Sequence, residues 1–246
     1  MTREAIIIET RDGRCPASVF TPTESRGPWP GVLFFMDGLG IRPSMWEMGQ
    51  RLADAGYLVL LPDLYYREGS YAPMDPSEVF SAPDARERLK QLVGSLTRER
   101  KIADATAFTD TLADRADVAG KRFGATGYCM GGNCALTAAG ALPERFAAVA
   151  SFHGGSLATD SPDSPHRFVD GITGRVYVAG AIEDAHFTDA EKQQLEDALT
   201  EAGVTHEVVT YEHARHGFAV PDMPVYSPEA AERHWDALLK LFGESL

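Results

Sequence analysis

The chain has 246 residues, 44% of them hydrophobic, and a formal net charge of −13 at pH 7. This length supports one well-buried core and is short for two, so we expect a single domain over residues 1–246. The acidic balance, without a long cluster of lysine and arginine, argues against nucleic-acid and membrane partners.

The N-terminal residues and the cysteines indicate where the protein works. Residues 1–9 contain only a short apolar run flanked by acids, which fits neither a signal peptide nor a membrane span, so we expect a cytoplasmic location. Cys15, Cys129 and Cys134 lack the short spacing of zinc or redox pairs. We therefore expect reduced thiols and no metal site.

The first elements predict a sheet that begins with a hairpin. Two strands are expected over 5–8 and 15–20, joined by an Asp-Gly turn at Asp12. Residues 31–36 form a continuous apolar run, which is typical of a strand buried on both faces of a parallel sheet. Apolar spacing predicts a helix over 43–55, and residues 57–61 predict the next buried strand.

A segment at about 67–100 is longer than a plain connection between strands requires. It carries a charged helix near 84–96, and segments of this kind often overhang a site. We therefore predict a helical insertion that covers part of the functional site.

From residue 102 onward, helices and strands alternate. Helices are expected over 102–112, 188–202 and 227–242, and strands over 123–127, 147–152, 175–180 and 207–211. This succession predicts an α/β fold, a mostly parallel sheet with helices on both faces, whose function lies at the carboxyl ends of the strands.

The run Gly127-Tyr128-Cys129-Met130-Gly131 stands between a predicted strand and an Ala-rich helix. Its Gly-x-Cys-x-Gly pattern has the layout of a nucleophile elbow, with cysteine in place of the usual serine. The sharp turn requires nearly side-chain-free residues two positions before and after the nucleophile, and a helix N-terminus favours a thiolate. The alternative is a buried structural cysteine beside a tightly packed helix.

A thiol nucleophile needs a base and a group that orients this base, and in α/β-hydrolases the acid precedes the histidine in the chain. Asp184 and His216 each follow a predicted strand in that order. Three residues compete with them: Glu183 and Asp189 for the acid, and His213 for the base. Asp189 is explained by a helix start, and Gly217 gives His216 room to reach the thiol, so we favour Asp184 and His216.

Acyl transfer also needs N–H donors for the oxyanion. Met130, after the nucleophile, supplies one donor by position, and either Gly38 or Leu39 in the loop after residue 36 supplies the second. His153 follows another predicted strand and either lines the pocket or has a structural role.

With these residues assembled, the sequence resembles the dienelactone hydrolase family of α/β-hydrolases over nearly its whole length. The likeness rests on Gly-Tyr-Cys-Met-Gly-Gly from Gly127, on Leu-Pro-Asp-Leu-Tyr ending at Tyr65, and on Asp184 and His216-Gly217-Phe218. The resemblance implies a cofactor-free hydrolase of small esters or lactones that uses a Cys129, His216 and Asp184 triad.

The resemblance also implies features around the triad. Asp37 stands near a family glutamate that interacts with the resting thiol, while Tyr65 and Phe218 are candidates for the pocket. Family members hold a substrate carboxylate with an arginine soon after the phenylalanine, where this chain has Val220. This departure argues against dienelactone itself and leaves the hydrolytic chemistry intact.

Two other functions stay open from the sequence. An acyltransferase or peptidase would use the same triad, because water and other nucleophiles compete for one thioester. A non-catalytic α/β-hydrolase scaffold would bind a ligand or partner instead.

Overall fold

The computed structural model describes residues 3–69, 71–72, 74–79 and 81–246. Eight strands form one sheet in the order β1-β2-β4-β3-β5-β6-β7-β8. The hairpin of β1 (Arg3–Thr10) and β2 (Gly13–Phe20) joins antiparallel to β4 (Leu58–Pro62). The remaining pairings are parallel and involve β3 (Trp29–Phe35), β5 (Val118–Tyr128), β6 (Phe146–Phe152), β7 (Arg175–Glu183) and β8 (His206–Arg215).

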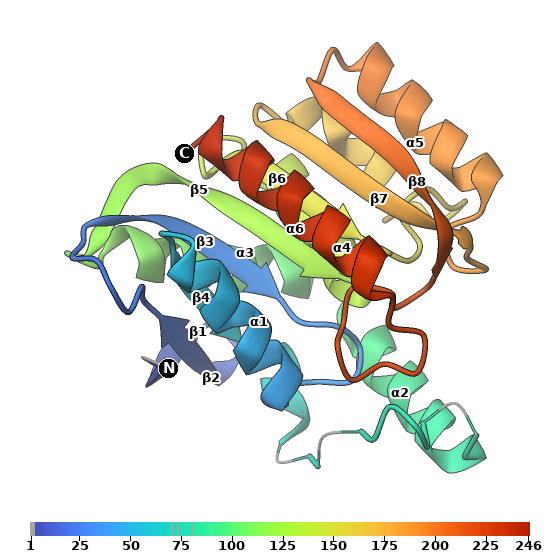
Figure 1. The fold of residues 1–246 in the computed structure, drawn as a ribbon, viewed down its shortest axis with the longest axis horizontal. Helices are drawn as coiled ribbons and strands as arrows, with labels where there is room; N and C mark the ends of the chain where they lie inside the picture. Colours follow the sequence, from blue (N-terminus) through green and yellow to red (C-terminus); the bar gives the residue numbers. More distant parts are fainter. Residues whose placement is uncertain (1–2, 70, 73, 80) are drawn as a thin grey trace.

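Helices cover both faces of this sheet, which confirms the predicted fold class (Figure 1). One face carries α1 (Pro43–Asp54) and α6 (Pro228–Gly243). The opposite face carries α3 (Arg98–Ala113), α4 (Met130–Ala141) and α5 (Asp189–Glu201), together with the short 3-10 helix η2 (Pro165–Gly171). None of the helices among the described residues is both long and apolar enough to cross a membrane.

The core lies where the sequence has continuous apolar runs. Residues 31–35 of β3 and all of β4 are buried, because helices pack on both faces of these central strands. Helix α4 is buried over most of its length, since its alanines and glycines allow close contact with the sheet on one side and α3 and η2 on the other.

Two elements are longer than their sequence patterns suggest. β5 begins at Val118 rather than residue 123, because Val118 and Ala119 pair with Trp29 and Pro30 although the next residues are polar. Helix α3 begins at Arg98 rather than 102, because Thr97 caps it by accepting a hydrogen bond from the Arg100 N–H.

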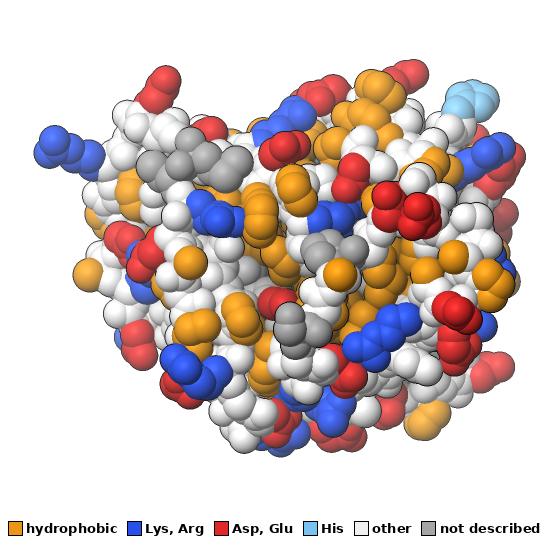
Figure 2. All heavy atoms as spheres, turned by 90° about the horizontal axis from the view of Figure 1, so that it is seen from below, with side chains coloured by type: hydrophobic (Ala, Val, Ile, Leu, Met, Phe, Trp, Pro, Cys, Tyr) orange, Lys and Arg blue, Asp and Glu red, His pale blue; other side chains and the backbone are white. Residues whose placement is uncertain are grey.

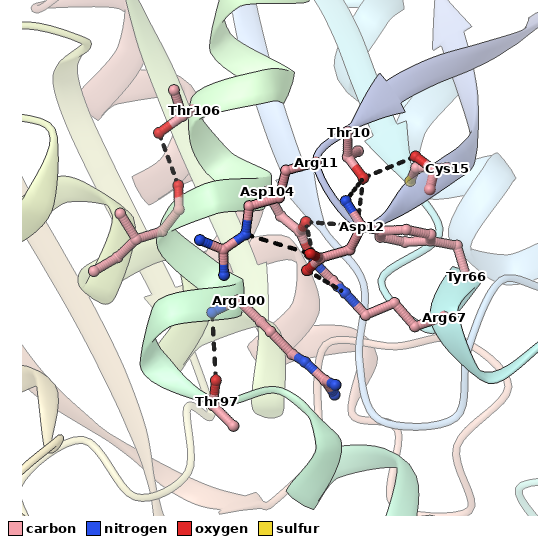
Figure 3. Close-up of polar contacts among 12 residues, drawn as sticks. Thr10, Arg11, Asp12, Cys15, Tyr66, Arg67, Thr97, Arg100, Asp104 and Thr106 are labelled. Atoms are coloured by element: carbon pink, nitrogen blue, oxygen red, sulfur yellow. Dashed lines mark hydrogen bonds and ion pairs between the residues drawn. The ribbon is translucent and has the colours of Figure 1, made fainter.

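The segment predicted as an insertion starts with the 3-10 helix η1 (Tyr66–Glu68) and contains α2 (Pro83–Ser95). A cluster of polar side chains holds its first turn against the β1-β2 hairpin and α3 (Figure 3). Arg67 Nη2 lies 2.7 Å from Asp12 Oδ2 and 2.7 Å from Asp104 Oδ1, and the Tyr66 hydroxyl donates to Asp104. The start of the segment is thus fixed, and α2 extends beyond the end of the sheet (Figure 1).

Candidate active site

The turn after β5 holds Cys129 in a conformation that few residues adopt. Its φ of 54° and ψ of −120° lie outside the ordinary regions for residues with a side chain, so the surrounding contacts must hold the strain. A Cβ on Gly127 would lie 2.0 Å from the Gly131 oxygen, and one on Gly131 would lie 2.4 Å from the Met36 oxygen. Both positions of the elbow therefore require glycine, as the pattern predicts.

The three predicted triad residues meet at the carboxyl ends of their strands. Cys129 Sγ lies 3.0 Å from His216 Nε2, and His216 Nδ1 lies 2.8 Å from Asp184 Oδ2. The other oxygen of Asp184 accepts the His186 N–H at 2.8 Å, so both oxygens are held. The Asp184 side chain is fully buried and that of His216 is 19% exposed.

The competing residues lie elsewhere. The Glu183 side chain is 69% exposed and pairs with Arg215, while that of Asp189 is 87% exposed and pairs with Lys192. His213 is an exposed residue of β8, before the strand ends. Among the acids and histidines that the sequence left open, Asp184 and His216 are the ones that the structure brings to the thiol.

The surroundings of His216 favour its charged form. Burial alone would lower the pKa of His216, but the Cys129 sulfur and the Asp184 carboxylate outweigh it and raise the pKa to about 10. Cys129 is also the residue at the N-terminus of α4, where unpaired N–H groups and the helix dipole favour negative charge. The contacts therefore favour an imidazolium ring at His216, beside a sulfur at the helix N-terminus.

Two further imidazole rings pack against the ring of His216. The centroid of His153 lies 5.3 Å away and that of the exposed His186 4.9 Å away, both edge to face. His153 is fully buried with a φ of 39°, and within the described chain neither of its ring nitrogens has a hydrogen-bond partner. Burial and then the charge of His216 hold the pKa of His153 well below its usual value. The His153 ring therefore lies beside His216 in its neutral form.

The two candidate loop donors for an oxyanion differ in their bonding. The Leu39 N–H donates to Asp37 Oδ1 at 2.9 Å and is occupied. No hydrogen bond of the Gly38 N–H is found within the part of the chain that the structure describes. The Gly38 carbonyl accepts the Tyr65 hydroxyl at 2.9 Å, which fixes this peptide. Met130 begins α4, where N–H groups lack partners inside the helix.

Asp37 lies at the rim of the site, but its carboxylate is engaged by Arg42 rather than by the thiol. Arg42 Nη1 lies 2.7 Å from Asp37 Oδ1, and Arg42 Nη2 lies 2.8 Å from Asp37 Oδ2. The expected contact between Asp37 and the sulfur would therefore require this bidentate pair to open.

A cavity of about 440 Å³ opens onto the sulfur. Leu39, Leu89, Val93 and Met223 give it apolar walls, and Lys90 and Lys101 contribute ammonium groups. The face of the molecule on the α2 side mixes apolar, cationic and acidic side chains around a hollowed centre (Figure 2).

Two predicted pocket residues stand behind the cavity rather than on its wall. Phe218 is fully buried and packs on the ring of His153, with centroids 5.1 Å apart. Tyr65 is equally buried and touches the site through Gly38. His153 and Asp37, in contrast, line the cavity itself.

Sequence reasoning missed three residues around the site: Arg42, Lys101 and Asp222. Lys101 is half-buried on α3, and its Nζ lies 2.7 Å from Asn133 Oδ1. A charged residue on a helix usually faces solvent, so the sequence carries no signal for it. Arg42 and Asp222 are 180 residues apart, and only the fold brings them together. No cluster of three potential metal ligands occurs among the described residues.

Comparisons with known proteins show the family of this chain. The model of the dienelactone hydrolase family matches residues 15–246. A Synechocystis sp. protein assigned as a carboxymethylenebutenolidase is 28% identical, with 89% of this chain and 88% of the relative covered. The Rhodococcus opacus carboxymethylenebutenolidase is 28% identical, with 95% and 88% covered.

A solved structure extends the likeness to three dimensions. A Klebsiella pneumoniae protein assigned as a dienelactone hydrolase superposes with a TM-score of 0.84 at 26% identity, covering 98% of both chains. The chain therefore belongs to the dienelactone hydrolase family.

Proposed function

We propose that this ester or lactone hydrolase works through Cys129, His216 and Asp184 and forms a thioester intermediate. The observation that carries the proposal is the unbroken row of contacts from sulfur to imidazole to carboxylate, 3.0 Å and then 2.8 Å long. These are the hydrogen-bond distances that a nucleophile, a base and an orienting acid require.

The first half of the reaction transfers the acyl group to sulfur. The Cys129 thiolate attacks the ester carbonyl, and the negative charge that develops on its oxygen is held by backbone N–H groups. When the tetrahedral intermediate collapses, the carbon to oxygen bond of the leaving group breaks and His216 gives its proton to the departing alkoxide. A thioester, a neutral imidazole and an alcohol result.

The second half releases the acid. His216 takes a proton from water as the water oxygen attacks the thioester, and the same N–H groups hold the new oxyanion. Expulsion of the sulfur restores the thiolate and imidazolium pair. Asp184 supports both halves, because it keeps Nδ1 protonated and leaves Nε2 facing the sulfur.

We assign the oxyanion donors to the N–H groups of Met130 and Gly38. Support comes from the bonding of the loop, because the Leu39 N–H already donates to Asp37 Oδ1 while the Tyr65 hydroxyl fixes the Gly38 peptide. A fixed donor stabilises developing charge without reorganising during the reaction.

The cavity suggests the class of substrate. Its volume of about 440 Å³ suits a small molecule, and its apolar walls suit a hydrocarbon part. The Lys101 ammonium donates to a neutral amide of Asn133 rather than to a carboxylate, so its charge is available to a ligand. We therefore propose a small ester or lactone with an anionic group, bound with that group toward Lys101 and Lys90. The cytoplasmic location inferred from the sequence stays a prediction.

The test is hydrolysis of small esters and lactones, both neutral and carboxylate-bearing, by the native enzyme and by Cys129→Ala. Cys134→Ala is the matched control, because that thiol is buried outside the triad. We expect Cys129→Ala to lose turnover while keeping its fold by circular dichroism, and mass spectrometry of the quenched native enzyme to find an acyl group on Cys129. Undiminished turnover by Cys129→Ala would refute the assignment, and ester formation with an added alcohol would favour acyl transfer over hydrolysis.

A further inference from the structure

Arg42 is a buried cation whose hydrogen-bonding capacity is fully used. Its side chain is 3% exposed. Nε and Nη2 donate to Asp222 at 2.7 and 3.0 Å, Nη1 and Nη2 donate to Asp37 at 2.7 and 2.8 Å, and Nη1 also donates to the Gly40 carbonyl at 3.1 Å. A guanidinium has five N–H donors, so every one of them has an acceptor.

The two carboxylates that Arg42 binds belong to two loops of the active site. Asp37 immediately precedes Gly38, whose N–H we assign to the oxyanion. Asp222 lies in the loop that begins with His216, and the next residue, Met223, lines the cavity. The Ser44 hydroxyl donates to Asp222 at 2.8 Å and holds that carboxylate from α1.

We propose that Arg42 is a positioning residue that joins the loop of Asp37 and Gly38 to the loop that begins with His216. By the same contacts it cancels the charge of Asp37 beside the reacting carbonyl. The inference rests on the proposed function, because it assigns Arg42 a role in stabilising an oxyanion formed by Cys129 attack. Asp222 is the outer support of this bridge.

Electrostatics explains why such a bridge is needed. Asp37 is 4% exposed and lines the cavity, so without a cation its carboxylate would act with little screening on the thiolate and the oxyanion. Both of those species are negative and would be destabilised by a like charge. Arg42 removes this repulsion and fixes the carboxylate that accepts the Leu39 N–H.

The shape of the guanidinium explains why arginine is needed. It binds Asp222 side-on through Nε and Nη2 and Asp37 end-on through Nη1 and Nη2, with two hydrogen bonds to each. A lysine ammonium is a compact point charge without this planar fork, so it would keep the charge and lose the geometry.

The experiment compares four variants with the native enzyme on the best small ester: Arg42→Met, Arg42→Lys, Asp37→Asn and Arg42→Met with Asp37→Asn. We expect Arg42→Met to lower kcat about 100-fold with KM within about threefold, because the oxyanion donor is displaced and an uncancelled carboxylate remains. Adding Asp37→Asn should recover at least roughly tenfold of that loss, because the repelling charge is gone. Arg42→Lys should fold and lose about tenfold in kcat.

The matched control is Arg51→Met, which removes an arginine of α1, the helix that Arg42 precedes, and this arginine pairs on the surface with Glu232. Its kcat should stay within about twofold of the native value. The inference is overturned if Arg42→Lys retains native kcat, or if Arg42→Met folds and the double variant is no faster than Arg42→Met. Full activity of the Arg42 variants with an inactive Cys129→Ala would refute the bridge alone, whereas an active Cys129→Ala would refute the proposed function.

Discussion

Replacement of Asp184 by asparagine tests the triad with almost no change in shape. The backbone N–H of His186 donates to Asp184 Oδ1 at 2.8 Å and cannot turn away. In the variant, the amide oxygen must therefore face His186, and the amide NH2 must face His216 Nδ1. Two donors cannot share one hydrogen bond, so His216 shifts to the tautomer with its proton on Nε2, directed at the Cys129 sulfur.

The expected loss of activity follows from the free-energy cost of the reactive tautomer, in which His216 carries its proton on Nδ1. It would leave the Nδ1 N–H unpaired in a buried site, at about 1 to 3 kcal/mol, and would forfeit a charge-assisted hydrogen bond of about 1.5 to 3 kcal/mol. The sum of about 2.5 to 6 kcal/mol corresponds to a loss of roughly 10²- to 10⁴-fold at about 1.36 kcal/mol per decade. The same exchange in a serine protease triad lowers kcat by about 10⁴-fold.

The assay is steady-state turnover of a small aryl ester together with the rate of Cys129 alkylation by iodoacetamide at pH 7. Asp184→Asn should lower both, with an unchanged circular dichroism spectrum. Glu183→Gln is the control, because this neighbouring acid is 69% exposed and should change kcat by less than about twofold. Activity of Asp184→Asn within tenfold of native, or an equal loss in Glu183→Gln, would refute the reasoning.

Three further predictions concern the thiol, the elbow and the cavity. Because the Cys129 sulfur lies beside His216 at the start of α4, we expect iodoacetamide to alkylate Cys129 at pH 7, while Cys134, whose pKa burial raises to about 11, stays unmodified in peptide mapping. Gly127→Ala would place a methyl group 2.0 Å from a carbonyl oxygen, so we expect a loss of about 3 kcal/mol or more and a melting temperature lower by roughly 10 °C. Lys101→Met should raise KM for a carboxylate-bearing ester about tenfold or more and leave KM for a neutral ester unchanged, because one charge-assisted contact is lost.

The fold and family were predictable because their signals are local. Gly127 and Gly131 flank Cys129 at the positions where a side chain would collide with the backbone. The five consecutive residues 127–131 are therefore enough to predict the elbow. The continuous apolar runs marked the central strands for a similar reason, since a strand buried on both faces has no polar side. The placement of Asp184 and His216 followed from the ends of their strands.

The choice between Gly38 and Leu39 was not predictable, because it depends on contacts between distant residues. The orientation of Asp37 decides which N–H is occupied, and Arg42 fixes that orientation together with Asp222, which is 180 residues from Arg42. The sequence predicted that the insertion covers the site, but not which side chains of α2, nor that Lys101, would line the cavity. A charged helix predicts a solvated surface, and only the packed structure shows which of its residues turn inward.

The site treats two buried carboxylates in opposite ways. Asp184 shares its charge with His216 and thereby favours the imidazolium that faces the thiolate. Asp37 lies on the wall of the same cavity, but Arg42 holds both of its oxygens and removes its charge from the reaction. A carboxylate in this site therefore aids the reaction only when an imidazole that carries a proton lies between it and the thiolate. Otherwise a cation must neutralise its negative charge. For this reason we expect the loss of Arg42 to slow the enzyme more than the loss of Asp37, although the two residues form one ion pair.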